Sequence, residues 1–501
     1  MTVTRAADPG AAVAGPGRRP WRDGVAAVGG PALLSLVLSL AWSWRPSYWQ
    51  DEAFTLSATS RPLTSLPHLL RDVDAVHGLY YALLNGWVHV STAAGWVRAP
   101  SGLATAVTAG LVVVLGWQLV DRRLGVVAGL IFAVLPISSY YGAEARGYAL
   151  AGMLGVASTV TAVAAAQRGA RRLWVVYATL VATAGYAFLF TVLVVAAHGV
   201  WLLAERRRRR VLVRWVGATA SAGVTLLPLA AVGSRQAAFQ INWINRPDAD
   251  SVAQSWRVWF SGSLLLALVI WTLVLVAVVA AVRAGRRGAG LSLVVMAGGI
   301  AVLPLALLIS LSAVQPVYTP RYVEASAVGF ALLAGYALTR LQGQRAALAG
   351  ALAGVAVVAV LGVPAQVLQR RPAGHGDTQA DLAARLRSEQ RAGDGVFYAP
   401  TYWRVSAAAY PASFRRLADP TLSADPIRNG DFIGGVATPQ LLRARLAGVD
   451  RIWWWHRDGL PGPNTDASRE LEVVRAAGFQ VVEHHDGAET DLELLQRDPR
   501  R

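Results

Sequence analysis

Apolar residues occupy long blocks of this chain, and polar segments rich in arginine, glycine and proline separate the blocks. A membrane-spanning helix needs about 20 mostly apolar residues, and blocks of this length recur between Val25 and Val363. The pattern predicts a polytopic α-helical membrane domain over residues 25–363. The polar, basic residues 1–24 are expected to form a disordered cytoplasmic N-terminus.

Arginine-rich segments between the apolar blocks give the orientation, because cytoplasmic loops of membrane proteins carry an excess of positive charge. Placing all five segments on the cytoplasmic side predicts about eleven spans and leaves the C-terminal part outside. We therefore expect a multi-pass protein of a bacterial plasma membrane. The expected spans are residues 25–44, 101–120, 124–141, 147–166, 172–187, 188–204, 211–230, 262–282, 290–311, 323–340 and 346–363.

One further apolar block, residues 77–97, is not counted among these spans. Counting it would move every later arginine cluster to the opposite side of the membrane. Polar positions interrupt the block, and Trp87 and Trp96 suit a membrane interface. We expect an amphipathic helix on the outer surface; a short true span, compensated elsewhere, is the alternative.

After residue 363 the long apolar blocks end. Residues 381–390 and 470–479 have the periodicity of helices, whereas residues 396–399, 451–455 and 480–483 read as strands. Alternating helices and strands predict a soluble, extracytoplasmic α/β domain over residues 364–501. It contains no glycine-rich phosphate loop and no nucleophile elbow, so we expect it to support the membrane domain or to recognise an acceptor.

Composition excludes several kinds of chemistry. The chain has no cysteine, which excludes disulfides and thiolate nucleophiles, and all 47 of its basic residues are arginine, which excludes lysine Schiff bases. The net charge of +17 belongs entirely to residues 1–363, because residues 364–501 have equal numbers of basic and acidic residues. Cytoplasmic loops account for this excess, so nucleic acid is not an expected partner.

Candidate functional residues gather in the expected outer loops. Ionisable groups at bilayer depth are costly and usually line cavities or functional sites. Carboxylates there can act as a general base or bind a divalent metal, and arginines can bind phosphate. The candidates are Asp51, Glu52, Asp74, His77, Arg98, Glu144, Arg146, Tyr148, Arg321 and Tyr322.

Most of these residues also have a purely structural interpretation. Asp51 and Glu52 could cap a helix that begins at Ala53, because acids suit the partial positive charge of a helix N-terminus. The other structural alternatives are a solvated loop charge for Asp74, an interfacial histidine for His77, an ion pair for Glu144 and Arg146, and contact with a lipid phosphate for Arg321.

Four short motifs on the expected outer side resemble those of the GT-C superfamily of membrane glycosyltransferases. They are an Asp-Glu pair after the first span, D-x-x-H-x-x-Y-Y about 23 residues later, Y-x-x-E-A-R-x-Y after the third span and P-R-Y near the tenth. The nearest resemblance is to family 39-type enzymes, related to protein O-mannosyltransferases and lipid A aminoarabinose transferases. It covers roughly residues 25–340.

The resemblance implies transfer of a sugar, with mannose the first candidate, from a polyprenyl-phosphate carrier to a protein, glycan or lipid acceptor on the outer face, with inversion. It places the base that accepts the acceptor proton at Asp51, with Glu52 and Asp74 as further catalytic candidates. The remaining candidates would bind substrate. The leaving phosphate is already a stable anion, so it needs cations rather than a proton donor.

The chain departs from the family pattern around His77, which is followed by Gly78-Leu79 and is separated from Asp74 by an extra residue. Members of the superfamily differ in metal dependence, so a divalent metal stays open as a cofactor. A transporter or lipid flippase that uses the outer acids for ion or proton coupling is the main alternative function, and a non-catalytic scaffold is another. Against transport, the spans carry almost no charge and no evident inverted repeat.

Overall fold

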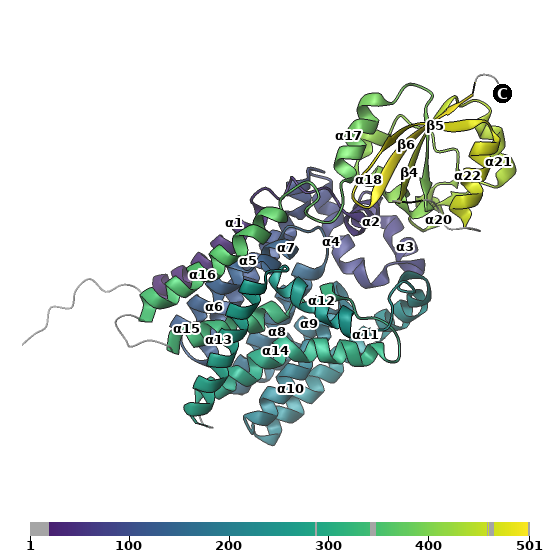
Figure 1. Cartoon of the computed structure of the whole chain (residues 1–501). Helices are drawn as coiled ribbons and strands as arrows, with labels where there is room; N and C mark the ends of the chain where they lie inside the picture. Colours follow the sequence, from purple (N-terminus) through teal and green to yellow (C-terminus); the bar gives the residue numbers. More distant parts are fainter. Residues whose placement is uncertain (1–19, 286–287, 341–346, 458, 460–464, 499–501) are drawn as a thin grey trace, which may run out of the picture.

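A helical bundle and a small α/β domain make up the computed structural model of the chain, which describes residues 20–285, 288–340, 347–457, 459 and 465–498 (Figure 1). Of the expected disordered N-terminus, residues 1–19 lie outside the described residues. The bundle contains α1 (Pro20–Leu40), α5 (Ala94–Leu119), α6 (Arg122–Val134), α7 (Pro136–Gly142), α8 (Tyr148–Arg168), α9 (Arg171–Ala187), α10 (Val194–Ala204), α11 (Arg209–Gln240), α13 (Leu264–Arg283), α14 (Ala289–Ser312), α15 (Ser326–Arg340) and α16 (Ala347–Leu368).

Six bundle helices are long and apolar enough to cross a membrane, namely α5, α8, α11, α13, α14 and α16. The pair α6–α7, bent by 65° around Pro136, would make a seventh. The expected eleven spans also require Gly24–Leu40 of α1, α9, α15 and the segment Leu189–Ala204, which are shorter. The protein is thus a multi-pass membrane protein with helices near every expected range, and the count of eleven stays a prediction.

The single amphipathic helix expected over residues 77–97 is wrong. This stretch forms α4 (Gly78–Val88), a link and the beginning of α5 at Ala94. The Trp87 and Trp96 rings stack 4.3 Å apart, and each indole N–H donates to the other residue's carbonyl oxygen, which closes the link. With 11 residues, α4 is too short to span a bilayer.

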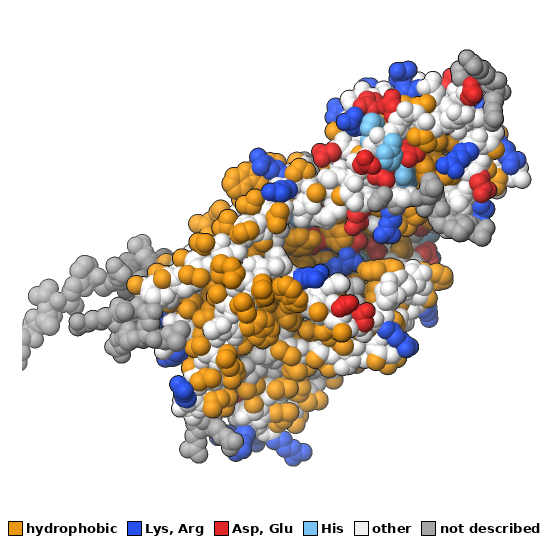
Figure 2. Space-filling view, viewed as in Figure 1, with side chains coloured by type: hydrophobic (Ala, Val, Ile, Leu, Met, Phe, Trp, Pro, Cys, Tyr) orange, Lys and Arg blue, Asp and Glu red, His pale blue; other side chains and the backbone are white. Residues whose placement is uncertain are grey.

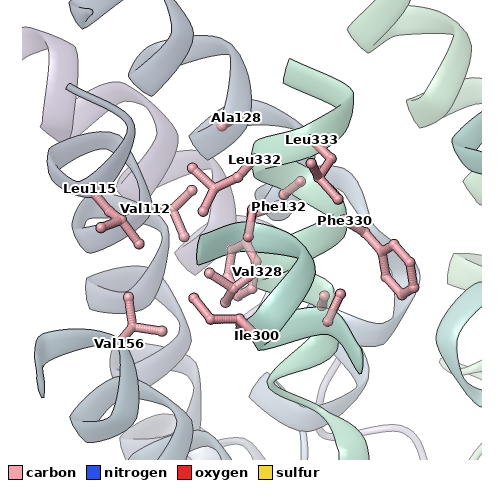
Figure 3. Close-up of a cluster of buried hydrophobic side chains, with 14 of the residues drawn as sticks. Val112, Leu115, Ala128, Phe132, Val156, Ile300, Val328, Phe330, Leu332 and Leu333 are labelled. Carbon is pink, nitrogen blue, oxygen red and sulfur yellow. The ribbon is translucent and has the colours of Figure 1, made fainter. Parts of the chain in front are cut away.

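The core of the bundle surrounds α15, whose side chains from Ser326 to Thr339 are all buried. They pack against apolar side chains of α5, α6, α8 and α14 (Figure 3). A helix that is apolar on every side is stable when protein surrounds it. By contrast, only 17% of the apolar window of α11 and 28% of those of α13 and α16 are buried, as suits helices that face lipid.

Short helices form a layer between the bundle and the C-terminal domain (Figure 1). They are α2 (Gln50–Thr59), η1 (Leu63–Ser65), α3 (Leu66–Asp72), η2 (Ala75–His77) and α4, with α12 (Ala249–Phe260) and η4 (Pro320–Val323) nearby. We call this end of the bundle the domain end. Basic side chains cluster at the opposite end (Figure 2), where Arg340 pairs with Asp121 at 3.2 Å.

The C-terminal domain contains a four-stranded sheet of order β1-β4-β6-β5 and a two-stranded sheet of β2 (Leu422–Ala424) and β3 (Gly435–Val436). Strands β1 (Gly395–Ala399) and β4 (Arg451–Arg457) are parallel, and β6 (Thr490–Arg497) pairs antiparallel with β4 and with β5 (Phe479–His485). The larger sheet packs α17 (Gln379–Glu389) on one face and α21 (Pro439–Leu446) with α22 (Asp466–Ala476) on the other. The expected helices and strands of this domain are all present, but β6 and α21 were not expected.

The C-terminal domain rests directly on α2. The Phe54 and Phe432 rings meet edge to face at 4.9 Å, and the Tyr48 N–H donates to the Tyr410 hydroxyl at 2.8 Å. Val405 and Phe432 join the same apolar cluster as Ala53 and Leu56. The helix that begins with Asp51 and Glu52 is therefore held between the two parts of the molecule.

Candidate functional site

Asp51 lies between two arginines at the domain end. Its Oδ2 is 3.4 Å from Nη1 of Arg321 and 3.7 Å from Nη2 of Arg146. The three residues come from α2, from η4 and from the loop between α7 and α8, so segments far apart in the sequence assemble this group. Acidic and basic side chains meet here in a recess below the C-terminal domain (Figure 2).

Aromatic rings hold the Arg321 guanidinium in place. It lies 5.3 Å from the centroid of the Trp49 ring, 5.4 Å from that of Trp243 and 5.9 Å from that of Tyr322. The Tyr141 hydroxyl donates to the Arg321 carbonyl oxygen at 2.7 Å, which fixes the backbone of η4. The guanidinium Nε is buried and has no hydrogen-bond partner among the residues that the structure describes.

Arg146 is buried and connects three parts of the layer. Its Nη1 donates to the Asp51 carbonyl oxygen at 3.2 Å and to the Thr55 hydroxyl at 3.3 Å, and its Nη2 lies 3.0 Å from Nε2 of His77. Burial lowers the pKa of Arg146, but the negative charge of Asp51 together with Tyr81, Tyr148 and Asp74 outweighs burial, so the net pKa lies well above its ordinary value. The Nε of Arg146, like that of Arg321, is buried and finds no partner within the described residues.

His77 and Asp74 belong to the same network. Burial and then the charges of Arg146 and Arg321 keep the pKa of His77 well below its ordinary value, so the neutral ring accepts from Arg146. Asp74 has a left-handed backbone with φ of 56°, which aspartate tolerates better than most residues. Its carboxylate accepts from the Tyr81 hydroxyl at 2.7 Å and from the Gln240 amide at 2.5 Å. Burial raises the pKa of Asp74.

Glu52 forms a separate, fully buried pair with Arg98. The guanidinium Nε and Nη2 donate to the two carboxylate oxygens at 2.8 and 2.5 Å, and the Ala145 N–H donates to Oε1 at 2.7 Å. Arg98 also donates to the carbonyl oxygens of Ser43, Pro46 and Ser47. Burial raises the pKa of Glu52, but Arg98 outweighs it, and the net pKa is lowered. The pair ties α2 to the start of α5 and to the turn that carries Arg146.

Glu144 and Arg146 do not pair with each other. In the part of the chain that the structure describes, the buried Oε2 of Glu144 has no hydrogen-bond partner. Burial first, and then the charge of Glu52, raises the pKa of Glu144 to about 8. At neutral pH Glu144 is therefore mostly a neutral acid. A Cβ at Gly147 would lie 2.8 Å from the Ala187 carbonyl oxygen, so only glycine lets this turn pack against α9.

Tyr148 and Tyr322 form an aromatic wall behind the arginines. Their ring centroids lie 6.2 Å apart, and both rings contact Phe188, at 5.1 Å for Tyr148 and 4.9 Å for Tyr322. Tyr148 also lies under Arg146 at 5.9 Å. The wall gives the charged group an apolar side toward the bundle.

The sequence-predicted residues thus divide into three groups. Asp51, Arg146, Arg321, His77 and Asp74 form one connected network with Tyr148 and Tyr322 beside it. Glu52 and Arg98 form a neighbouring pair that points away from Asp51, and Glu144 stands close to both without an ion pair in the described chain. Two arginines lie beside the single carboxylate of Asp51, and the raised pKa of Asp74 reduces its negative charge. The network therefore favours the binding of an anion. Its paired acids leave no free set of carboxylates, which would be needed for a divalent metal.

Sequence analysis missed several members of the network. Gln240 ends α11, and Trp243 lies in the link that follows. His375, in the segment after α16, was also missed; it packs against Tyr140 at 4.8 Å and lies 3.9 Å from Glu52 of the neighbouring pair. Trp49 and Tyr81 could have been suspected from their places in the sequence. Trp49 lies two residues before Asp51, and Tyr81 ends the motif that contains His77. No local pattern marks a glutamine near the end of an apolar helix as a site residue.

Comparison with known proteins rests on structure, since neither a protein-family model nor a curated protein matches this sequence. The ArnT protein of Cupriavidus metallidurans bound to undecaprenyl phosphate is similar, with a TM-score of 0.61 and 12% identity over 95% of this chain and 98% of ArnT. Its apo state gives 0.58 and 13% over the same shares. A weaker likeness, with a TM-score of 0.49 and 10% identity, is to the archaeal oligosaccharyltransferase AglB from Archaeoglobus fulgidus. Because the ArnT likeness covers nearly the whole of both chains, it confirms the fold expected from the motifs, and this protein has the fold of ArnT.

Proposed function

We propose that the protein is a glycosyltransferase that takes a sugar from a polyprenyl-phosphate carrier and transfers it, with inversion, to a hydroxyl acceptor on the extracytoplasmic face of the membrane. Mannose is the first sugar to test. The acceptor is a protein, a glycan or a lipid. The fold it shares with ArnT supports a lipid-linked donor, because one ArnT structure contains undecaprenyl phosphate.

The observation that carries this proposal is the position of Asp51 between Arg146 and Arg321. Both guanidiniums have a buried Nε without a partner in the described part of the chain, so each has unused capacity for an oxygen ligand. A phosphate has several such oxygens, and arginine binds them in a planar fork. Donor phosphate would therefore draw the arginines away from Asp51 and leave its carboxylate ready to accept a proton.

The proposed reaction assigns a role to each of these groups. The acceptor oxygen attacks the anomeric carbon from the side opposite the phosphate and gives its proton to Asp51. The bond between that carbon and the phosphate oxygen breaks, and polyprenyl phosphate leaves as an anion. Arg146 and Arg321 stabilise its charge, and His77 holds Arg146 from behind without adding a charge.

The site's position in the bundle supports chemistry at one membrane face. The network lies at the domain end, whereas arginines cluster at the opposite end, which suits the cytoplasm. A transporter would instead need polar groups along a path through the bundle. The gathering of the site's charges at one end thus favours transfer over transport.

The test is incubation of the purified protein with polyprenyl-phosphate sugars, mannose first, and a panel of acceptors, scored by sugar release and by product. Arg321→Lys keeps the charge but loses the planar fork, so donor binding should weaken while the protein still folds. Arg257→Lys, on α12, is the matched control and should bind the donor normally. Unchanged donor affinity in Arg321→Ala would remove Arg321 from the site. No binding of any polyprenyl-phosphate sugar would overturn the proposal.

A further inference from the structure

A histidine and two glutamates converge on the C-terminal domain, away from the site described above. Glu389 is the last residue of α17, and Glu483 and His485 lie on the edge strand β5. Their nearest ligand atoms all lie within 4.8 Å of one another. Histidine side chains bordered by acidic ones are visible on this surface (Figure 2).

The distances fit a shared cation better than a hydrogen bond. His485 Nε2 is 3.5 Å from Glu389 Oε2 and 3.7 Å from Glu483 Oε2, and the described chain offers no hydrogen-bond partner to His485 Nε2 or Glu389 Oε2, although both atoms are buried. Zinc binds nitrogen and oxygen at about 2.0–2.2 Å, so two ligands of a tetrahedral zinc lie about 3.4 Å apart. The observed spacings are close to that value.

The preceding residue shows what ordinary pairing looks like. His484 Nε2 lies 2.7 Å from Asp486 Oδ1, and its Nδ1 lies 3.0 Å from Glu493 Oε1. These are hydrogen-bond distances on the same strand. Had His485 been placed only to pair with carboxylates, the same close contacts would be expected.

A β-bulge turns the two β5 ligands toward α17. Val481 pairs with Leu495, but the next pair is Glu483 with Leu494, so one residue is inserted. Directly opposed residues of an antiparallel pair point to the same face. Leu492 and Leu494 pack against α17, so the bulge places Glu483 and His485 on that face, beside Glu389.

The rest of the surroundings fit a cation as well. Arg385 donates to Glu389 Oε1 at 3.2 Å, which orients the carboxylate and leaves Oε2 free. Two carboxylates and a neutral imidazole balance a divalent charge. The Glu483 side chain is 49% exposed, so the site is open to solvent and leaves room for a water ligand.

We propose that Glu389, Glu483 and His485 bind one zinc ion, which joins α17 to the edge strand of the C-terminal domain. The imidazole nitrogen favours zinc over magnesium or calcium, which prefer oxygen ligands. Such a cross-link would stabilise the domain that covers α2. It would do so whether or not the protein transfers sugar.

The experiment uses the full-length protein, purified with a histidine-free tag and stripped with a chelator, and titrated with zinc chloride alone. Wild type should bind one equivalent more than His485→Gln, and zinc should raise its thermal midpoint. His484→Gln is the matched control and should keep the wild-type stoichiometry. Glu389→Gln should weaken zinc binding at least tenfold, and magnesium should not substitute.

Equal zinc stoichiometry and affinity in wild type and His485→Gln, both eluting as folded protein, would overturn the proposal. Loss of the same equivalent in His484→Gln would also overturn it, because it would move the site to the other face of β5. Failure of sugar transfer in the test of the preceding section would leave this result unaffected, since the readout is metal binding.

Discussion

At the residue scale, two adjacent acids have different surroundings although the sequence presents them as a pair. Asp51 pairs with two arginines and keeps 23% of its side chain exposed, whereas Glu52 is fully buried against Arg98. Neither acid caps α2, because Trp49 occupies the N-cap position and no side chain forms a capping hydrogen bond there. One acid is thus available to a substrate, and the other is enclosed by protein.

Replacement of Asp51 tests the assignment of the base. Asp51→Asn keeps the size of the side chain but cannot accept the proton, so turnover should fall by roughly 10²–10⁴. Donor binding should hold, since removing a negative charge from between two arginines does not weaken their grip on phosphate. Asp72→Asn, an exposed acid of the same segment, is the control in the transfer assay. Near-normal turnover in a folded Asp51→Asn protein would contradict this assignment and make Asp74 or Glu144 the next candidate for the base.

Replacement of Glu52 should instead affect folding. Glu52→Gln leaves the buried Arg98 charge without its counter-ion, and breaking a buried pair in this way costs about 3–5 kcal/mol. We expect a lower thermal midpoint and a poor yield of folded protein. Normal thermal stability together with lost turnover would instead assign Glu52 to the chemistry.

Glu144 should make stability depend on pH. Burial raises its pKa to about 8 from an ordinary value of 4.5, so between these values the folded state keeps a proton that the unfolded state releases. The contribution of protonated Glu144 to the free energy of unfolding is therefore fully present below about pH 4.5, declines as pH rises and is lost above pH 8. The glutamine of Glu144→Gln carries no charge at any pH. As pH rises, the free energy of unfolding of this variant should therefore increase relative to that of wild type, by at most about 1.4 kcal/mol per pH unit.

Thermal midpoints measured from pH 5 to pH 8 check this expectation, with the exposed Glu472→Gln as the control. If the difference in thermal midpoint between Glu144→Gln and wild type stays constant with pH, Glu144 is ionised in the folded protein.

At the element scale, the end of α11 supports the first loop of the site. Gln236 accepts from the Ala75 N–H at 2.9 Å and donates to the Leu70 carbonyl oxygen at 3.0 Å, while Gln240 holds Asp74. These contacts join residues more than 160 positions apart. They position η2, and with it His77 and Asp74.

Gln236→Leu should therefore loosen this loop. It removes both hydrogen bonds and leaves a backbone donor and acceptor unpaired, at a cost of about 1–3 kcal/mol each when buried. Hydrogen–deuterium exchange of residues 70–77 should accelerate, with no change in α15. The exposed Gln254→Leu on α12 is the control. Unchanged exchange in Gln236→Leu would show that α11 does not position η2.

Sequence reasoning succeeded at this scale where a signal is local. Apolar length and arginine clusters located the helices, and the motifs placed Asp51, Arg146 and Arg321 in one site. The end of α4 was not predicted because the Trp87–Trp96 contact that closes the link leaves no mark in the local hydrophobic pattern. The role of Gln236 was invisible because its partners lie far away in the chain, and β6 was missed because its acidic residues interrupt the apolar pattern of a strand.

At the scale of the whole molecule, the arrangement predicts which way the protein faces. The site and the C-terminal domain share one end of the bundle, and the arginine-rich turns share the other. A reporter that is active only in the cytoplasm, fused after Arg501, should therefore be silent. The same reporter fused after Arg207, in the turn between α10 and α11, is the positive control. Strong activity after Arg501 would reverse the topology and the face on which transfer occurs.

The contact between the C-terminal domain and α2 also has a consequence for biosynthesis. Asp51 leaves the ribosome early, but Arg321 and then Phe432, which covers α2, follow about 270 and 380 residues later. Because synthesis proceeds at about 5–20 residues per second, Phe432 is made roughly 20–80 s after Asp51. A nascent or truncated chain in the membrane thus has the acid without its second guanidinium or its lid of protein. On the proposed function, such incomplete chains should therefore be inactive.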